Sequence, residues 1–132
     1  MIEIKSRKDL EHYRVERAYG TLVEAEDNAH MGHWTLAANR LYYALFYMST
    51  ALLLDKGIEA KSHAGVIAKV GQNFVLSGLL SRDDARLISA LQNMRHQGDY
   101  DDFNDWTEAD VQPMFEPTRQ LLDKMKSLLT LI

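Results

Sequence analysis

The stretch from Trp34 to Leu54 constrains the fold most strongly. Its small and apolar side chains recur at steps of three and four, which is the spacing of one face of an α-helix. They are Trp34, Ala37, Ala38, Leu41, Tyr42, Leu45, Met48, Ser49 and Leu52. A second, largely apolar line consists of Leu36, Arg40, Tyr43, Tyr47 and Leu54. A helix that is apolar on two sides needs a partner on each, so we expect a central helix that ends near Lys56-Gly57.

Helical spacing and capping residues also mark the other segments. Residues 10–29 place apolar side chains near one face, and Gly32 is the expected stop. Ser62 is predicted to cap a third helix that ends at Ser77-Gly78. Two capping boxes, Ser81 with Asp84 and Thr107 with Asp110, are predicted to open a fourth and a fifth helix. Pro113 and Pro117 are expected to interrupt the first half of the fifth.

No stretch of the chain alternates with the period of a β-strand, and 132 residues suit one hydrophobic core. We therefore expect one all-α domain over residues 1–132, an antiparallel bundle of about five helices with short loops.

Composition excludes several classes of protein. The chain has no cysteine, which excludes disulfides and thiolate metal sites. No apolar run reaches the roughly 20 residues of a membrane span, and the start lacks a signal-peptide core, so we expect a cytoplasmic protein without a membrane partner. No two of the five histidines have the i, i+4 spacing of a helical zinc site. We therefore expect no metal and no cofactor.

Two arginines stand among apolar helical positions. Arg95 follows Leu91 by four residues, at the edge of the fourth helix's buried stripe. It can reach solvent along that stripe, form an ion pair with a nearby acid, or hold a phosphate, because a guanidinium matches phosphate oxygens. Arg40 lies between Leu36 and Tyr43, and a charge there needs a partner, either a structural carboxylate or a ligand. Its neighbour Asn39 should point about 100° away and serve a different contact.

The chain resembles the HEPN family of small helical bundles. The resemblance spans about Tyr13 to Leu128 and depends on three stretches: AANRLYYA from Ala37, KSHAGV from Lys61, and Arg95 followed by Asp99-Tyr100. It implies a homodimer that pairs with a minimal nucleotidyltransferase in a toxin–antitoxin type system. Active members are metal-independent ribonucleases whose motif is arginine, four to six residues, then histidine.

Arg95 matches the arginine of that motif, but Tyr100, Asp101 or Asp102 stands where the histidine is expected. An unperturbed tyrosine is only about 0.1% ionised at pH 7, so Tyr100 is a poor general base. The chain thus resembles a subgroup in which Asp99 pairs with Arg95, and Gly98 is expected to let the backbone turn so that Asp99 can face the guanidinium.

Three functions follow as hypotheses. The first is a dimeric module for a nucleotide or RNA, whose cleft residues are Arg40, Tyr43, His63, Arg95, Asp99 and Tyr100. The second is a ribonuclease toxin with Arg95, Tyr100, His63 and His96 as candidate catalytic residues, although His63 also suits a hydrogen-bonded position at the edge of the core. The third is a purely structural interaction domain. The missing histidine favours the first, and charge near the core argues against the third.

Overall fold

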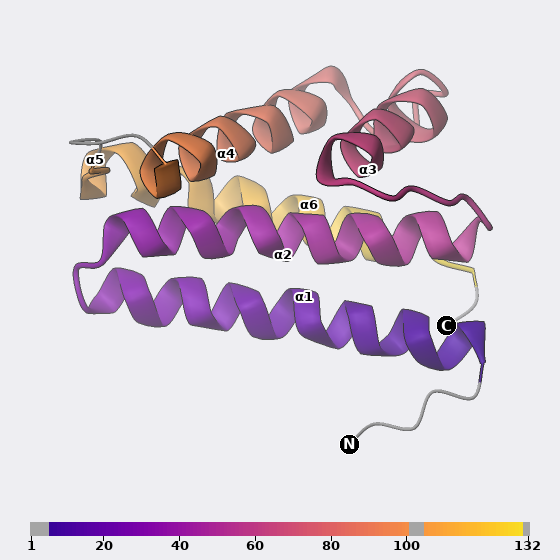
Figure 1. Cartoon of the computed structure of the whole chain (residues 1–132), viewed down its shortest axis with the longest axis horizontal. Coiled ribbons are helices and arrows are strands. Elements are labelled where there is room, and N and C mark those ends of the chain that lie inside the picture. The colour runs from indigo at the N-terminus through magenta and orange to yellow at the C-terminus, as the bar shows by residue number, and fades with distance from the viewer. Residues whose placement is uncertain (1–5, 101–104, 131–132) are drawn as a thin grey trace.

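The helical spacing of the sequence is realised along the chain. The computed structural model describes residues 6–100 and 105–130. Within these ranges, long helices run in alternating directions: α1 (Arg7–His30), α2 (Trp34–Asp55), α4 (Arg82–Tyr100) and α6 (Phe115–Ser127) (Figure 1). The shorter elements are α3 (His63–Val70), the π-helical turn η1 (Gly71–Val75), α5 (Glu108–Val111) and the 3-10 turn η2 (Gln112–Met114). The described residues contain no strand, so the predicted all-α class is confirmed.

The central position predicted for α2 is also confirmed. It packs against α1 on one side and against α3 and α4 on the other, with α6 behind (Figure 1). Its inner face, including Leu41 and Met48, is fully buried. Each such side chain stabilises the fold by roughly 1.5–3 kcal/mol. The second line of α2 is not buried: Tyr43 and Tyr47 are half-buried, and Leu36 is 54% exposed. One aromatic side of the central helix therefore reaches the surface of the chain.

Helix starts follow the capping residues. The Ser62 hydroxyl accepts a hydrogen bond from a backbone N–H in the first turn of α3. Ser81 and Asp84 exchange reciprocal backbone bonds of 2.8 and 3.0 Å, and Thr107 and Asp110 form the second capping box. Each cap satisfies helix N–H groups that have no partner inside the helix. The three predicted starts are therefore confirmed.

Helix ends follow the sequence less closely. The first helix stops where expected, since Gly32 has a φ of 76°, a conformation that favours glycine. The predicted third helix changes at Gly71 into the π-helical turn η1. The predicted fifth helix is divided, because Pro113 lies in the 3-10 turn η2 and α6 begins only at Phe115.

One buried polar contact ties the two ends of the described chain together. Glu11 of α1 is fully buried against Asp55, the last residue of α2. Asp55 accepts hydrogen bonds from the backbone and hydroxyl of Thr130 and forms a 2.9 Å ion pair with Lys56. Two carboxyl groups can share a hydrogen bond only when one of them carries a proton, so buried Glu11 is best accommodated against Asp55 with a proton.

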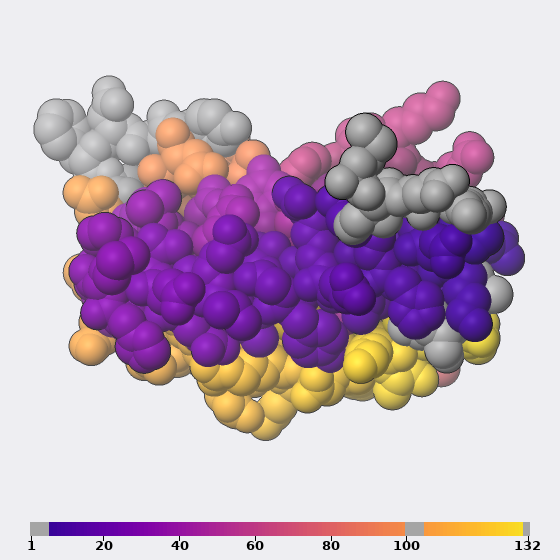
Figure 2. Space-filling model, turned by 90° about the horizontal axis from the view of Figure 1, so that it is seen from below, coloured from indigo at the N-terminus to yellow at the C-terminus, as the bar shows by residue number. Residues whose placement is uncertain are grey.

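The outer face of the bundle belongs mostly to α1, with α6 along one edge (Figure 2). Among the described helices, none combines the length and the apolarity that a membrane span requires. Helices α3 and α4 lie on the side of α2 that faces away from α1 (Figure 1).

Candidate functional site

Arg95 lies at the contact between α4 and α2. Its guanidinium donates a 2.9 Å hydrogen bond to the Tyr43 hydroxyl and lies 5.4 and 5.7 Å from the ring centres of Tyr43 and Tyr42. Only 17% of the side chain is exposed. The faces of the tyrosine rings attract the cation, so α2 contributes a hydrogen bond and two cation–π contacts to one charge on α4.

Asp99 is the carboxylate partner of Arg95, as the sequence predicts. The two residues are one helical turn apart on α4, and the Arg95 Nε and Asp99 Oδ2 atoms are 3.3 Å from each other. The same oxygen of Asp99 accepts a 2.9 Å hydrogen bond from the Asn39 side chain of α2. Asp99 therefore fastens Arg95 and joins α4 to α2.

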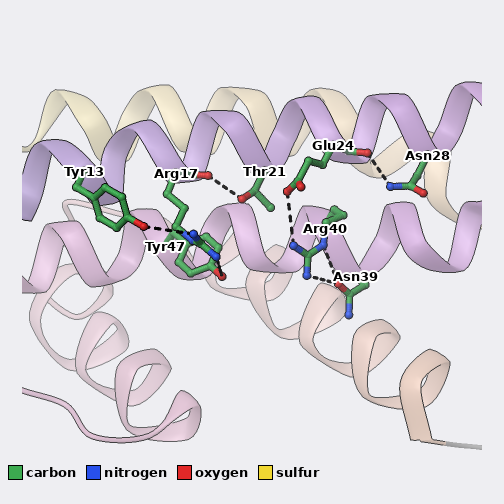
Figure 3. Close-up of polar contacts among 8 residues, drawn as sticks. All are labelled: Tyr13, Arg17, Thr21, Glu24, Asn28, Asn39, Arg40 and Tyr47. Carbon is green, nitrogen blue, oxygen red and sulfur yellow. Dashed lines mark hydrogen bonds and ion pairs between the residues drawn. The ribbon is translucent and has the colours of Figure 1, made fainter. Parts of the chain in front are cut away.

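Asn39 extends this network to the second arginine. Its Oδ1 atom accepts hydrogen bonds of 3.0 and 2.7 Å from Nε and Nη2 of Arg40, and the other side of Arg40 faces Glu24 of α1 at 3.6 Å (Figure 3). Of the two partners that the sequence allowed for Arg40, a structural carboxylate or a ligand, the structure contains the carboxylate of Glu24. Asn39 serves a different contact, as expected, because its amide nitrogen binds Asp99, but its amide oxygen also binds Arg40.

His63 enters the site from the first turn of α3. Its Nδ1 atom is 3.0 Å from the hydroxyl of Tyr42, and its ring stacks on Phe46 at 4.1 Å. Burial, followed by the charge of Arg95, lowers the pKa of His63, so the neutral imidazole is favoured at neutral pH. Burial raises the pKa of Tyr42 to about 12, so its hydroxyl keeps a proton that it can donate to Nδ1.

We call Tyr42, Tyr43, His63, Arg95 and Asp99 the Arg95 cluster. It brings together a partly exposed imidazole, a guanidinium and a carboxylate at the meeting of α2, α3 and α4. The guanidinium can bind an anion, and a neutral imidazole can accept a proton. In the part of the chain that the structure describes, no group of three or more acidic or imidazole side chains could hold a metal ion.

The expected turn at Gly98 was wrong. Gly98 lies inside α4, and ordinary helical spacing brings Asp99 back to Arg95. The glycine instead permits close packing: a Cβ atom there would lie 2.9 Å from the Thr35 methyl and 3.2 Å from Nε1 of Trp106. The Trp106 indole also donates a 2.9 Å hydrogen bond to the Met94 carbonyl. Gly98 therefore sets how closely α4 approaches the start of α2.

The remaining candidates are His96 and Tyr100, with Asp101 and Asp102. His96 is exposed and follows Arg95 directly in α4. Tyr100 is the last residue of α4, and its side chain lies outside the described part of the structure, as do Asp101 and Asp102. The fold brings His63 of α3 close enough to Arg95 of α4 for the guanidinium to lower the pKa of the imidazole.

Sequence reasoning missed Tyr42 as a member of the site and assigned it only to the core. The signal was available in principle, since a buried tyrosine hydroxyl usually finds a hydrogen-bond partner. The partner itself could not be identified, because His63 is 21 residues away and on another helix.

Comparison with known proteins identifies the family. The HEPN domain model matches residues 12–128. A UPF0332 protein of Thermotoga maritima is 33% identical over 93 residues, which cover 70% of each chain. A Methanocaldococcus jannaschii protein named "Putative toxin" is 27% identical over 129 residues, 98% of this chain and 87% of the relative. Since the model match covers most of the bundle, including every described member of the Arg95 cluster, the chain belongs to the HEPN family.

Proposed function

We propose that the chain is a homodimeric HEPN binding module whose Arg95 cluster holds a phosphate group of a nucleotide or RNA. It acts with a separate minimal nucleotidyltransferase in a two-component system of the toxin–antitoxin type. The observation that carries the proposal is the setting of Arg95: one guanidinium is held by Tyr43 and Asp99 at a partly exposed meeting of three helices. A positioned guanidinium binds phosphate at a smaller entropic cost than a free one.

The exposed side of α2 supports dimerisation. Leu36 is 54% exposed and Tyr43 is half-buried, so apolar and aromatic surface continues from the cluster toward the start of the helix. A second copy would cover this surface and enclose the guanidinium, which strengthens its attraction for an anion. Light scattering at tens of micromolar should give the mass of a dimer, and a monomer would contradict this part of the proposal.

The second candidate is a metal-independent ribonuclease. His63 favours it, because this imidazole is held by Tyr42 near Arg95 and its lowered pKa makes it a proton acceptor at neutral pH. The name "Putative toxin" carried by relatives in Methanocaldococcus jannaschii agrees with such an activity. In this alternative Arg95 binds the phosphate that is attacked, and His63 takes the place of the motif's absent histidine.

One set of variants distinguishes the two candidates. RNA is incubated in EDTA with the wild type, Arg95→Ala, His63→Ala and the exposed control Arg86→Ala, and binding of a labelled oligoribonucleotide is measured in parallel. The binding module predicts no cleavage, and binding that Arg95→Ala weakens at least tenfold while Arg86→Ala leaves it unchanged. Cleavage that both Arg95→Ala and His63→Ala abolish would favour the ribonuclease. Binding that is equal in all four proteins would overturn both.

A further inference from the structure

A second basic site lies on the seam between α1 and α2, where two hollows meet at Arg14. One is a cavity of about 380 Å³ between the end of α2, residues 58–61 and α3. The other, of about 270 Å³, lies over Phe46 and Tyr47. Arg14 and Thr50 line both, so the two hollows adjoin at the Arg14 guanidinium, and we call the two together the Arg14–Arg17 trough.

Arg14 has few partners for a partly buried charge. Its Nη1 atom donates a 3.2 Å hydrogen bond to the Thr50 carbonyl, and no carboxylate of the described chain lies within ion-pair distance. Burial therefore lowers the pKa of Arg14 with no nearby acid to offset it. A guanidinium carries five N–H donors, and a desolvated one without an anion is costly, so most of its binding capacity is available to a ligand.

Arg17, one helical turn away, points into the same trough. It lies between the hydroxyls of Tyr13 and Tyr47, at 3.4 and 3.3 Å, and its guanidinium stands 4.8 Å from the centre of the Tyr47 ring (Figure 3). These tyrosines hold Arg17 in place without neutralising it, and in the described structure it too lacks a carboxylate within ion-pair distance. Lys61 lines the larger hollow, where Glu59 is the acidic lining residue.

Cations beside two other surface hollows differ in this respect. Arg119 lies 3.4 Å from carboxylate oxygens of both Glu26 and Glu116, and Lys124 is 2.6 Å from Asp84. Those cations already have their anions. The Arg14–Arg17 trough differs from these two hollows because its arginines contact neutral groups only.

We propose that this trough binds a small phosphate monoester with an apolar body. Arg14 and Arg17 take the phosphate, and the body enters the cavity lined by Leu53, Leu54, Ile58 and Val66. The trough adjoins the Arg95 cluster, because Phe46 lines it and stacks on His63, but its arginines belong to α1 and it does not depend on the function proposed for that cluster.

Charge and shape select this class of ligand. The lining has a net charge of two positive charges, from Arg14, Arg17 and Lys61 minus the charge of Glu59. This matches a phosphate monoester, which carries close to two negative charges above pH 7. The planar guanidinium fork fits phosphate oxygens better than it fits a halide or a neutral group. The aliphatic lining adds affinity for an apolar body but none for inorganic phosphate.

Phenyl phosphate, inorganic phosphate and phenol are suitable probes, each titrated into the full chain and followed by amide NMR shifts. Phenyl phosphate should saturate and shift amides of α1 and of residues 50–61. Inorganic phosphate and phenol should each bind at least tenfold more weakly, because each supplies only half of the recognition. Inorganic phosphate binding as tightly as phenyl phosphate, or no saturation below about 10 mM, would overturn the proposal.

Variants assign the two halves of the site. Arg14→Gln should weaken phenyl phosphate at least tenfold and Arg14→Lys less, while Ile58→Ser should weaken phenyl phosphate and leave inorganic phosphate unchanged. Arg86→Gln should stay within twofold of the wild type, and Arg95→Ala should leave the phenyl phosphate shifts of α1 and of residues 50–61 in place. Circular dichroism checks that each variant folds. Equal binding by Arg14→Gln and the wild type, or loss in Arg95→Ala alone, would overturn this site, and the second outcome would return the phosphate to the Arg95 cluster.

Discussion

The Arg95 cluster and the Glu11–Asp55 contact both bury an ionisable side chain. The partner of Arg95 has the opposite charge, whereas the partner of Glu11 has the same charge. At Arg95 a guanidinium meets a carboxylate and two tyrosine rings, all of which favour its charge. At the other end of α2, two carboxyl groups meet, and the pKa of Glu11 rises to about 7 through burial first and then through Asp55. Attraction fixes a side chain in position, whereas repulsion makes protonation part of folding. The first arrangement suits a binding site and the second makes stability depend on pH.

The largest expected effect tests the repulsive end. A folded Glu11 with a pKa of about 7 binds a proton that the unfolded chain releases near 4.5, so stability falls as the pH rises through that window. Arg7 and Lys56 oppose this loss, and Asp55 reinforces it. Glu11→Gln cannot ionise, so relative to the wild type it should gain up to about 3 kcal/mol between about pH 4.5 and pH 8.

The measurement is chemical denaturation of both proteins across that pH range. The exposed Glu16→Gln serves as control and should follow the wild type. A difference between Glu11→Gln and the wild type that does not change with pH would mean that Glu11 is ionised in the folded chain throughout.

A smaller effect tests how α4 is seated against α2. The higher helix propensity of alanine should make Gly98→Ala more stable by about 1 kcal/mol. The new Cβ, however, would lie 2.9 Å from the Thr35 methyl, and such overpacking typically costs about 1–3 kcal/mol. We expect a net destabilisation of about 1 kcal/mol. Gly20→Ala is the matched control, because a Cβ at this exposed position of α1 meets nothing within 4 Å. It should be stabilising by about 0.5–1 kcal/mol, and stabilisation by both substitutions would show that α4 does not approach Thr35 so closely.

A further effect of similar size tests the attractive end directly. A double-mutant cycle on Arg95→Ala and Asp99→Ala should give a coupling of about 1 kcal/mol, because Arg95 is largely buried and Asp99 also holds Asn39. The exposed pair of Arg86 and Asp83, only 2.7 Å apart, should couple close to zero, since water screens it. Both cycles are measured by denaturation at one protein concentration, because dimerisation would make stability depend on concentration. Additive effects at Arg95 and Asp99 would mean that the two side chains do not support each other.

The parts of this fold that were predictable depend on contacts within about four residues. The caps at Ser62, Ser81 and Thr107 join a side chain to its own first turn, and the Arg95–Asp99 pair spans one turn of α4. Helical spacing alone brings such groups together. Helical spacing also grouped the second line of α2, but we expected a neighbouring helix to cover it. Its exposure was not predicted, because residue type does not tell which side of a helix the neighbours cover.

By itself, then, the sequence determined the helical class, the helix starts, the central position of α2 and the Arg95–Asp99 pair. Only the tertiary structure decided that Asn39 joins Arg40 to Asp99, that Tyr42 meets His63, and that Glu11 lies against Asp55. These contacts join residues on different helices, and their partners depend on how the helices cross. The local period of a helix is written in its spacing, whereas the meeting of two helices depends on the packing of the whole core.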